Sequence, residues 1–157
     1  MLLVLGLGFA GIAAARRARA EGHAVAGTAR DPATLAPDMQ PLAILFAGAA
    51  AAIRAASHLL VTTPPGETGD PVLAVHRAAL DAALAGGGLR WVGYVSTTGV
   101  YGDRDGAEVD EDTPPAPGQP RSRRRLAAEE AWRAVTAART TLHVMAAGGL
   151  YEAGRSS

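Results

Sequence analysis

The chain has 157 residues, no cysteine, and 15 basic against 15 acidic side chains, so its formal net charge is zero. A neutral chain has no overall field to attract nucleic acid or an anionic membrane surface, and neither is expected as a partner. The lack of cysteine excludes disulfides, thiolate metal sites and thiol catalysis, and it fits the reducing cytoplasm, where we expect the protein to act. The length predicts one domain over residues 1–157.

The start of the chain has the pattern of a βαβ unit. Residues 1–5 form a short apolar run without alternation, which is typical of a strand buried on both faces of a parallel sheet. The run is too short for a membrane span and lacks the basic flank of a signal peptide. A helix ended by Gly22 and a second apolar strand over 25–28 complete a unit of about the expected 30 residues.

Three glycines lie between the first strand and its helix in the spacing G-x-G-x-x-G. Gly6 permits a tight turn, Gly8 lets a pyrophosphate approach the backbone, and Gly11 lets the helix pack closely on the strand. Phosphates would sit at the helix N-terminus, where unpaired N–H groups and the helix dipole favour negative charge. A chain rich in alanine and glycine can meet this spacing by chance, but here strand, motif, helix and strand follow in the right order. We therefore predict cofactor contacts at Gly6, Gly8, Phe9 and Gly11.

The rest of the chain alternates apolar strand patterns with helix patterns. We expect strands over residues 42–46, 57–63, 91–96 and 142–146, and helices over 49–56, 71–85 and 121–139. Residues 102–120 are acidic and rich in proline and glycine, which predicts a long exposed loop. This alternation predicts an α/β fold with a doubly wound parallel sheet, the Rossmann fold, in strand order 3-2-1-4-5-6.

Ligands in such sheets bind beyond the carboxyl ends of the strands. Four segments with small, hydroxyl or charged residues follow strands here: 6–11, 28–30, 62–65 and 96–102. We expect them to converge on one site. The further cofactor contacts predicted on this basis are Thr28, Arg30, Thr62, Thr63 and Pro64.

The end of the second strand usually decides between the two nicotinamide dinucleotides. An acid there holds the ribose 2′-OH of NAD, whereas an arginine accommodates the 2′-phosphate of NADP. Arg30 follows Thr28 and Ala29 with no carboxylate before it, so NADP is favoured and NAD is the second choice. Asp31 lies about 20 residues after the last glycine, where an NAD acid is expected, and Arg30 could instead pair with it.

One block of residues suggests a family. Residues 96–102, Ser-Thr-Thr-Gly-Val-Tyr-Gly, precede Val-Asp-Glu at 109–111 and a proline-rich run. This block resembles the extended short-chain dehydrogenases of the NAD-dependent epimerase/dehydratase family. The glycine motif and Thr-Thr-Pro-Pro at 62–65 are similar to an atypical branch of it. The resemblance covers essentially the whole chain and implies a protein shortened to its Rossmann half, with the substrate-binding half missing.

The resemblance implies catalytic positions but leaves two of them unfilled. Thr97, three positions before Val100, would help to bind and polarise the substrate, although a hydroxyl at a strand end can equally cap local backbone. The family's tyrosine acid/base and its lysine four residues later are absent, and Arg121 and Arg125 stand at those positions. The chain has no lysine. Tyr101 is the tyrosine that we expect near the substrate, or else a packing residue at the pocket mouth.

The charged clusters have simpler explanations. Most of the arginines in the run Arg121, Arg123, Arg124 and Arg125 are interpreted as a solvated helix start. The acidic residues between 103 and 112 do not place a glycine where an EF-hand loop needs it, which favours a solvated turn. The four histidines do not have zinc-site spacing, and no metal is predicted.

The resemblance implies an NAD(P)-dependent oxidoreductase or a nucleotide-sugar-epimerase-like protein acting on a small-molecule substrate. The missing tyrosine and lysine leave an alternative, a non-catalytic NAD(P)-binding sensor or interaction module. The sixth strand has no following helix pattern, so we expect apolar surface near Leu142, Val144, Leu150 and Tyr151. An identical subunit would cover it, which predicts a homodimer. Helices 71–85 and 121–139 offer a second surface for such a contact.

Overall fold

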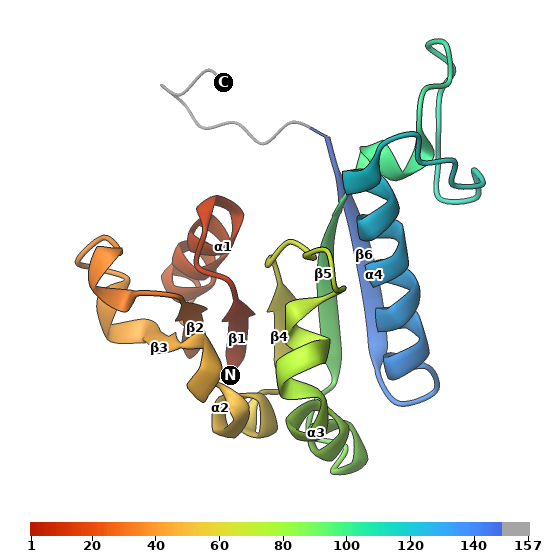
Figure 1. The fold of residues 1–157 in the computed structure, drawn as a ribbon. Helices are drawn as coiled ribbons and strands as arrows, with labels where there is room; N and C mark the ends of the chain where they lie inside the picture. Colours follow the sequence, from red (N-terminus) through yellow and green to blue (C-terminus); the bar gives the residue numbers. More distant parts are fainter. Residues whose placement is uncertain (149–157) are drawn as a thin grey trace.

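The computed structural model describes residues 1–148, which hold six strands in one parallel sheet (Figure 1). The strands are β1 (Leu2–Leu5), β2 (Val25–Ala29), β3 (Ala43–Leu45), β4 (His58–Val61), β5 (Trp91–Thr97) and β6 (Thr141–Ala147). Their order, β3-β2-β1-β4-β5-β6, confirms the predicted 3-2-1-4-5-6 Rossmann topology. All neighbouring strands pair in parallel.

The helices of the described residues begin and end close to the predicted positions. They are α1 (Phe9–Ala20), α2 (Ala50–Ala55), α3 (Pro71–Ala85) and α4 (Pro120–Thr136). Helix α4 ends earlier than predicted, because Ala137 leaves the helical conformation with ψ of 128° and Ala138 follows it with a left-handed φ of 57°. Within residues 1–148 no helix is both long enough and apolar enough to cross a membrane.

Asp70 begins α3 and also connects this helix to α4. Its Oδ1 atom accepts hydrogen bonds from the backbone N–H groups of Val72 at 2.8 Å and Leu73 at 3.1 Å, with Pro71 at the first helical position. This is the helix start expected from an Asp-Pro pair. The other carboxylate oxygen accepts from the indole N–H of Trp132 in α4 at 3.1 Å. One buried carboxylate therefore fixes two helices against each other.

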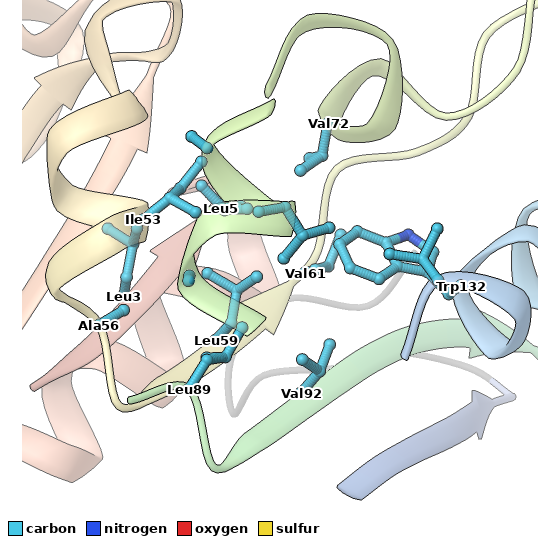
Figure 2. Close-up of a cluster of buried hydrophobic side chains, with 14 of the residues drawn as sticks. Leu3, Leu5, Ile53, Ala56, Leu59, Val61, Val72, Leu89, Val92 and Trp132 are labelled. Atoms are coloured by element: carbon cyan, nitrogen blue, oxygen red, sulfur yellow. The ribbon is translucent and has the colours of Figure 1, made fainter. Parts of the chain in front are cut away.

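The sheet has a hydrophobic core on each face. Leu3, Val4 and Leu5 are all fully buried because alternate residues of β1 point to opposite faces. Leu3 and Leu5 belong to the larger core, where strand residues meet α2, α3 and Trp132 of α4 (Figure 2). Val4 packs in the smaller core beneath Ala15 of α1. Burial on both faces explains why this strand is apolar without alternation.

The apolar residues of the edge strand β6 differ in their exposure. Leu142 and Val144, where exposed apolar surface is predicted, are half-buried and pack against the larger core. The exposed apolar residue of this strand is Met145, at 38% exposure, on the opposite face. On that face the indole N–H of Trp91 donates to Nδ1 of His143 at 2.9 Å. Leu150 and Tyr151 lie outside the described residues.

Candidate functional site

A cleft of about 230 Å³ lies at the edge of the sheet where the strands end. Residues from the start of α1, the ends of β4, β5 and β6, and the first turns of α4 line it. These are Gly8, Phe9, Ala10, Gly11, Thr62, Val95, Ser96, Thr97, Arg121, Arg125, Ala147 and Gly148. The structure thus brings together three of the four segments expected to converge. Of the predicted site residues, the cleft is lined by Gly8, Phe9, Gly11, Thr62 and Thr97.

Gly6 is held from both neighbouring strands. Its φ of 111° lies in the left-handed region that favours glycine. Its N–H donates to the Thr28 hydroxyl of β2 at 3.0 Å, and its carbonyl accepts from the Thr62 hydroxyl, just after β4, at 2.5 Å. Thr28 is only 1% exposed, so it acts on the cleft through Gly6. Thr28 and Thr62, both predicted as cofactor contacts, therefore hold the glycine turn in place.

Gly8 and Gly11 have different reasons to be glycine. A Cβ at Gly11 would collide with the Gly6 carbonyl oxygen, so the close packing of helix on turn requires glycine there. A Cβ at Gly8 would meet no heavy atom within 4 Å. Gly8 caps α1, whose first turn carries no acidic side chain and no side-chain cap. The backbone N–H groups in the first turn of α1 are therefore free to bind an anion, and the open space at the Gly8 Cβ site leaves room for it.

Thr63 and Pro64 follow β4 but do not line the cleft. Pro64 is exposed. The Thr63 hydroxyl is buried and has no hydrogen-bond partner in residues 1–148. An unpartnered buried hydroxyl costs about 1–3 kcal/mol, so a polar group that entered beside it would be bound favourably. The backbone of Thr63 lies next to the glycine turn, since a Cβ at Gly6 would come within 3.1 Å of its nitrogen.

Arg30 extends into solvent directly after β2. It makes no hydrogen bond or ion pair within the described residues. The Asp31 carboxylate instead accepts from the Ala33 N–H at 3.0 Å and caps a single-turn helix, η1 (Pro32–Thr34). The ion pair between Arg30 and Asp31 that the sequence allowed is therefore not formed. A free guanidinium stands at the position that contacts the adenosine ribose in Rossmann proteins.

The end of β5 carries two hydroxyl groups, on Ser96 and Thr97, that differ in their hydrogen bonds. The Thr97 hydroxyl accepts from the Gly99 N–H at 3.2 Å and caps the single-turn helix η4 (Thr98–Tyr101), which leaves its own hydrogen free to donate. Ser96 is buried and donates to the carboxylate of Glu129 in α4. Glu129 is 4% exposed and also accepts from Arg133 at 3.2 Å. The Thr97 hydroxyl is thus available in the cleft, whereas the Ser96 hydroxyl is engaged by Glu129.

Neither tyrosine of this region lines the cleft. Tyr101 is half-buried on η4 and is not among the residues that line the cleft. Tyr94 of β5 is fully buried behind the cleft wall, and its hydroxyl accepts from Nη1 of Arg125 at 3.3 Å. Burial raises the pKa of Tyr94, and the hydrogen bond from Arg125 opposes this only in part. Tyr94 therefore remains protonated at neutral pH.

Two arginines at the start of α4 enter the cleft, and they are the two at the positions of the family's tyrosine and lysine. Arg125 donates from Nη1 to the Val95 carbonyl at 3.0 Å, with its guanidinium carbon 5.7 Å from the centre of the Tyr94 ring. Arg121 makes no hydrogen bond or ion pair within residues 1–148. Arg123 points elsewhere and donates to the Gly118 carbonyl at 2.7 Å. Arg121 and Arg123 are exposed, whereas Arg124 and Arg125 are half-buried.

The site as a whole defines a class of protein. A parallel sheet in this order, with a glycine turn that leads into the free N-terminus of a helix at the strand ends, is a nucleotide-binding Rossmann-type domain. No family model and no curated protein matches the chain.

Solved structures do match it. The chain is 39% identical to a conserved protein of unknown function from Silicibacter pomeroyi DSS, over 96% of this chain and 52% of that one, with a TM-score of 0.84. It is 28% identical to a candidate NAD-dependent epimerase/dehydratase from Methylobacillus flagellatus, over 98% and 56% of the two chains, with a TM-score of 0.72. A short-chain dehydrogenase/reductase superfamily protein from Agrobacterium tumefaciens with bound NAD shares the fold at 24% identity, over 93% and 48%, with a TM-score of 0.73.

The sequence predicts a resemblance to the NAD-dependent epimerase/dehydratase family, and these neighbours confirm it. The part of each neighbour that matches is a Rossmann domain. The chain spans about half the length of the solved structures that it matches.

Proposed function

We propose that the chain binds a nicotinamide dinucleotide at the turn from Gly6 to Gly11 and acts as an oxidoreductase or a nucleotide-sugar-epimerase-like protein. The observation that carries the proposal is the contrast at the two later glycines. Gly11 is required by the packing of the chain itself, whereas nothing in residues 1–148 requires glycine at position 8. Space for a Cβ, free N–H groups and the positive end of α1 coincide there, which suits a pyrophosphate.

NADP is the cofactor that we favour over NAD. Arg30 is free to bind a phosphate, and the Asp31 carboxylate is engaged by the Ala33 N–H instead of facing a ribose. A guanidinium supplies charge-assisted hydrogen bonds to a phosphate, whereas NAD offers only a hydroxyl at that position. The neighbour from Agrobacterium tumefaciens contains NAD, which supports a nicotinamide cofactor without deciding between the two forms.

Within residues 1–148 the cleft offers positioning groups but no acid or base. A nicotinamide cofactor supplies hydride transfer when it is bound. Thr97 can donate its free hydrogen to a substrate oxygen and so polarise it. Arg121 and Arg125 remain charged at all ordinary pH values, and none of the lining residues is a histidine, carboxylate, lysine or tyrosine.

A fluorescence titration with NADPH and NADH tests the proposal. We expect both to bind, NADPH more tightly, and no binding of either at millimolar concentration would overturn the proposal. Stopped-flow measurement of cofactor oxidation with carbonyl substrates then separates an enzyme from a sensor. Binding without turnover of any substrate would favour the non-catalytic alternative that the missing tyrosine and lysine leave open.

A further inference from the structure

We infer that the α4 side of the cleft holds an oxyanion, a carboxylate or phosphate carried by the substrate, between Arg121 and Arg125. This inference rests on the proposed cofactor binding, because it assigns the anion to the substrate and leaves the cofactor's pyrophosphate at Gly8. The two arginines lie one helical turn apart on α4 and both line the cleft.

Arg125 is fixed in place before any ligand arrives. Its Nη1 atom donates to the Val95 carbonyl and to the Tyr94 hydroxyl, and its guanidinium lies over the Tyr94 ring. The other N–H groups of this guanidinium have no partner within residues 1–148. A guanidinium held on one side presents its remaining donors to a carboxylate or phosphate at little further loss of side-chain entropy.

Arg121 stands where a cation is unfavourable without an anion. It lies in the first turn of α4, at the positive end of the helix dipole, and that turn contains no acidic residue. The N-cap Gln119 makes no side-chain hydrogen bond to the free N–H groups of this turn. A bound oxyanion would satisfy the guanidinium, the helix N-terminus and the open N–H groups together.

Among residues 1–148, no acid that lines the cleft neutralises the two arginines. The lining residues include no aspartate or glutamate. The carboxylate of Glu129 lies on the same helix but is buried, where it accepts from Ser96 and Arg133. The cleft therefore keeps two fixed positive charges for a ligand.

The arginines and Thr97 lie on the same side of the cleft, away from the glycine turn. Helix α4 packs along β5 and β6, whereas α1 lies beside β1 and β2 (Figure 1). Thr97, at the end of β5, can donate to a carbonyl or hydroxyl oxygen while the arginines hold an acidic group. The substrate class is thus a small molecule that carries both a reactive oxygen and an oxyanion.

The test is calorimetric titration of the NADPH-saturated protein with inorganic phosphate, malonate and uncharged malonamide. We expect phosphate or malonate to bind and malonamide not to bind, and the better anion separates the two oxyanion sources. Arg121→Ala should weaken anion binding at least about tenfold, the loss expected for hydrogen bonds between charged groups. Arg124→Ala removes the same charge from the same region of α4 but lies outside the cleft lining, so it should change anion binding less than about twofold. Both variants should keep the NADPH affinity of the wild type, which also shows that they are folded.

Three results would overturn the inference while leaving cofactor binding intact. The first is the absence of anion binding to the saturated protein, and the second is an equal loss in Arg121→Ala and Arg124→Ala. The third is competition between the anions and NADPH together with weaker NADPH binding in Arg121→Ala, which would assign the arginines to the cofactor's own phosphate. If the wild type binds neither NADPH nor NADH, the proposed function itself is wrong and the inference falls with it.

Discussion

The two walls of the cleft are built in different ways. The glycine turn is fixed by contacts with the two strands beside β1, since Thr28 and Thr62 hydrogen-bond to Gly6 and Gly11 packs against its carbonyl. The α4 wall is fixed by side-chain contacts between α4 and β5, such as Arg125 with Val95 and Ser96 with Glu129. The first wall has the features of Rossmann proteins in general. The α4 wall carries arginines where the family that the chain resembles has a tyrosine and a lysine. We therefore expect the residues that determine substrate specificity to lie on the α4 wall.

The largest expected effect is on the glycine wall. Gly11→Ala places a methyl group against the Gly6 carbonyl oxygen, which is backbone held by two further hydrogen bonds and cannot easily move. Overpacking of this kind costs about 1–3 kcal/mol, and the upper end is expected here. Chemical denaturation measures the loss of unfolding free energy. Gly48→Ala, at an exposed glycine with open space around its Cβ, is the matched control, and equal stability of the two variants would contradict the close packing.

The next prediction concerns the choice of cofactor. Arg30→Ala should weaken NADPH binding by about 1.5–3 kcal/mol, the range for hydrogen bonds to charged groups, and leave NADH binding nearly unchanged. Fluorescence titration of both cofactors measures the difference. Arg54→Ala removes an exposed arginine from α2, away from the cleft lining, and should affect neither cofactor. Equal losses for NADPH and NADH in Arg30→Ala would show that Arg30 does not distinguish them.

The smallest effect is a pH dependence behind the α4 wall. Burial raises the pKa of Tyr94 above its ordinary value of 10.0, so folding favours the protonated phenol. The raised pKa of Tyr94 contributes to the free energy of unfolding in full below pH 10, and this contribution is lost as the pH rises from there toward the folded-state pKa. Denaturation curves at increasing alkaline pH should show stability falling more steeply in the wild type than in Tyr94→Phe. A Tyr94→Phe variant whose stability falls with alkaline pH as steeply as that of the wild type would contradict the effect.

The sequence predicted the fold and the glycine wall because both rest on local patterns. The apolar run of β1 and the glycine spacing each have a physical reason that can be recognised within a few residues. The same holds for Arg30, whose position follows from the end of β2.

The α4 wall could not be predicted in this way. The pairing of Ser96 with Glu129, and of Arg125 with Val95, depends on how α4 lies on β5, and that orientation has no signature in the residue spacing. Which of the four arginines between positions 121 and 125 face the cleft is decided by the same packing. The available signal was the alignment of Arg121 and Arg125 with the family's missing pair. The homodimer and the cytoplasmic location stay predictions.

The central claim, that the space above Gly8 receives the cofactor's pyrophosphate, is tested most directly by the NADPH and NADH affinities of Gly8→Val. Position 8 is an N-cap with extended backbone and no heavy atom within 4 Å of its Cβ site. The free energy of unfolding of the variant should therefore lie within about 1 kcal/mol of the wild-type value. It should lose at least about tenfold, or about 1.4 kcal/mol, in affinity for both cofactors. Gly88→Val, at another glycine with open space, should lose none. A folded Gly8→Val variant that binds both cofactors as tightly as the wild type would contradict the assignment of this turn.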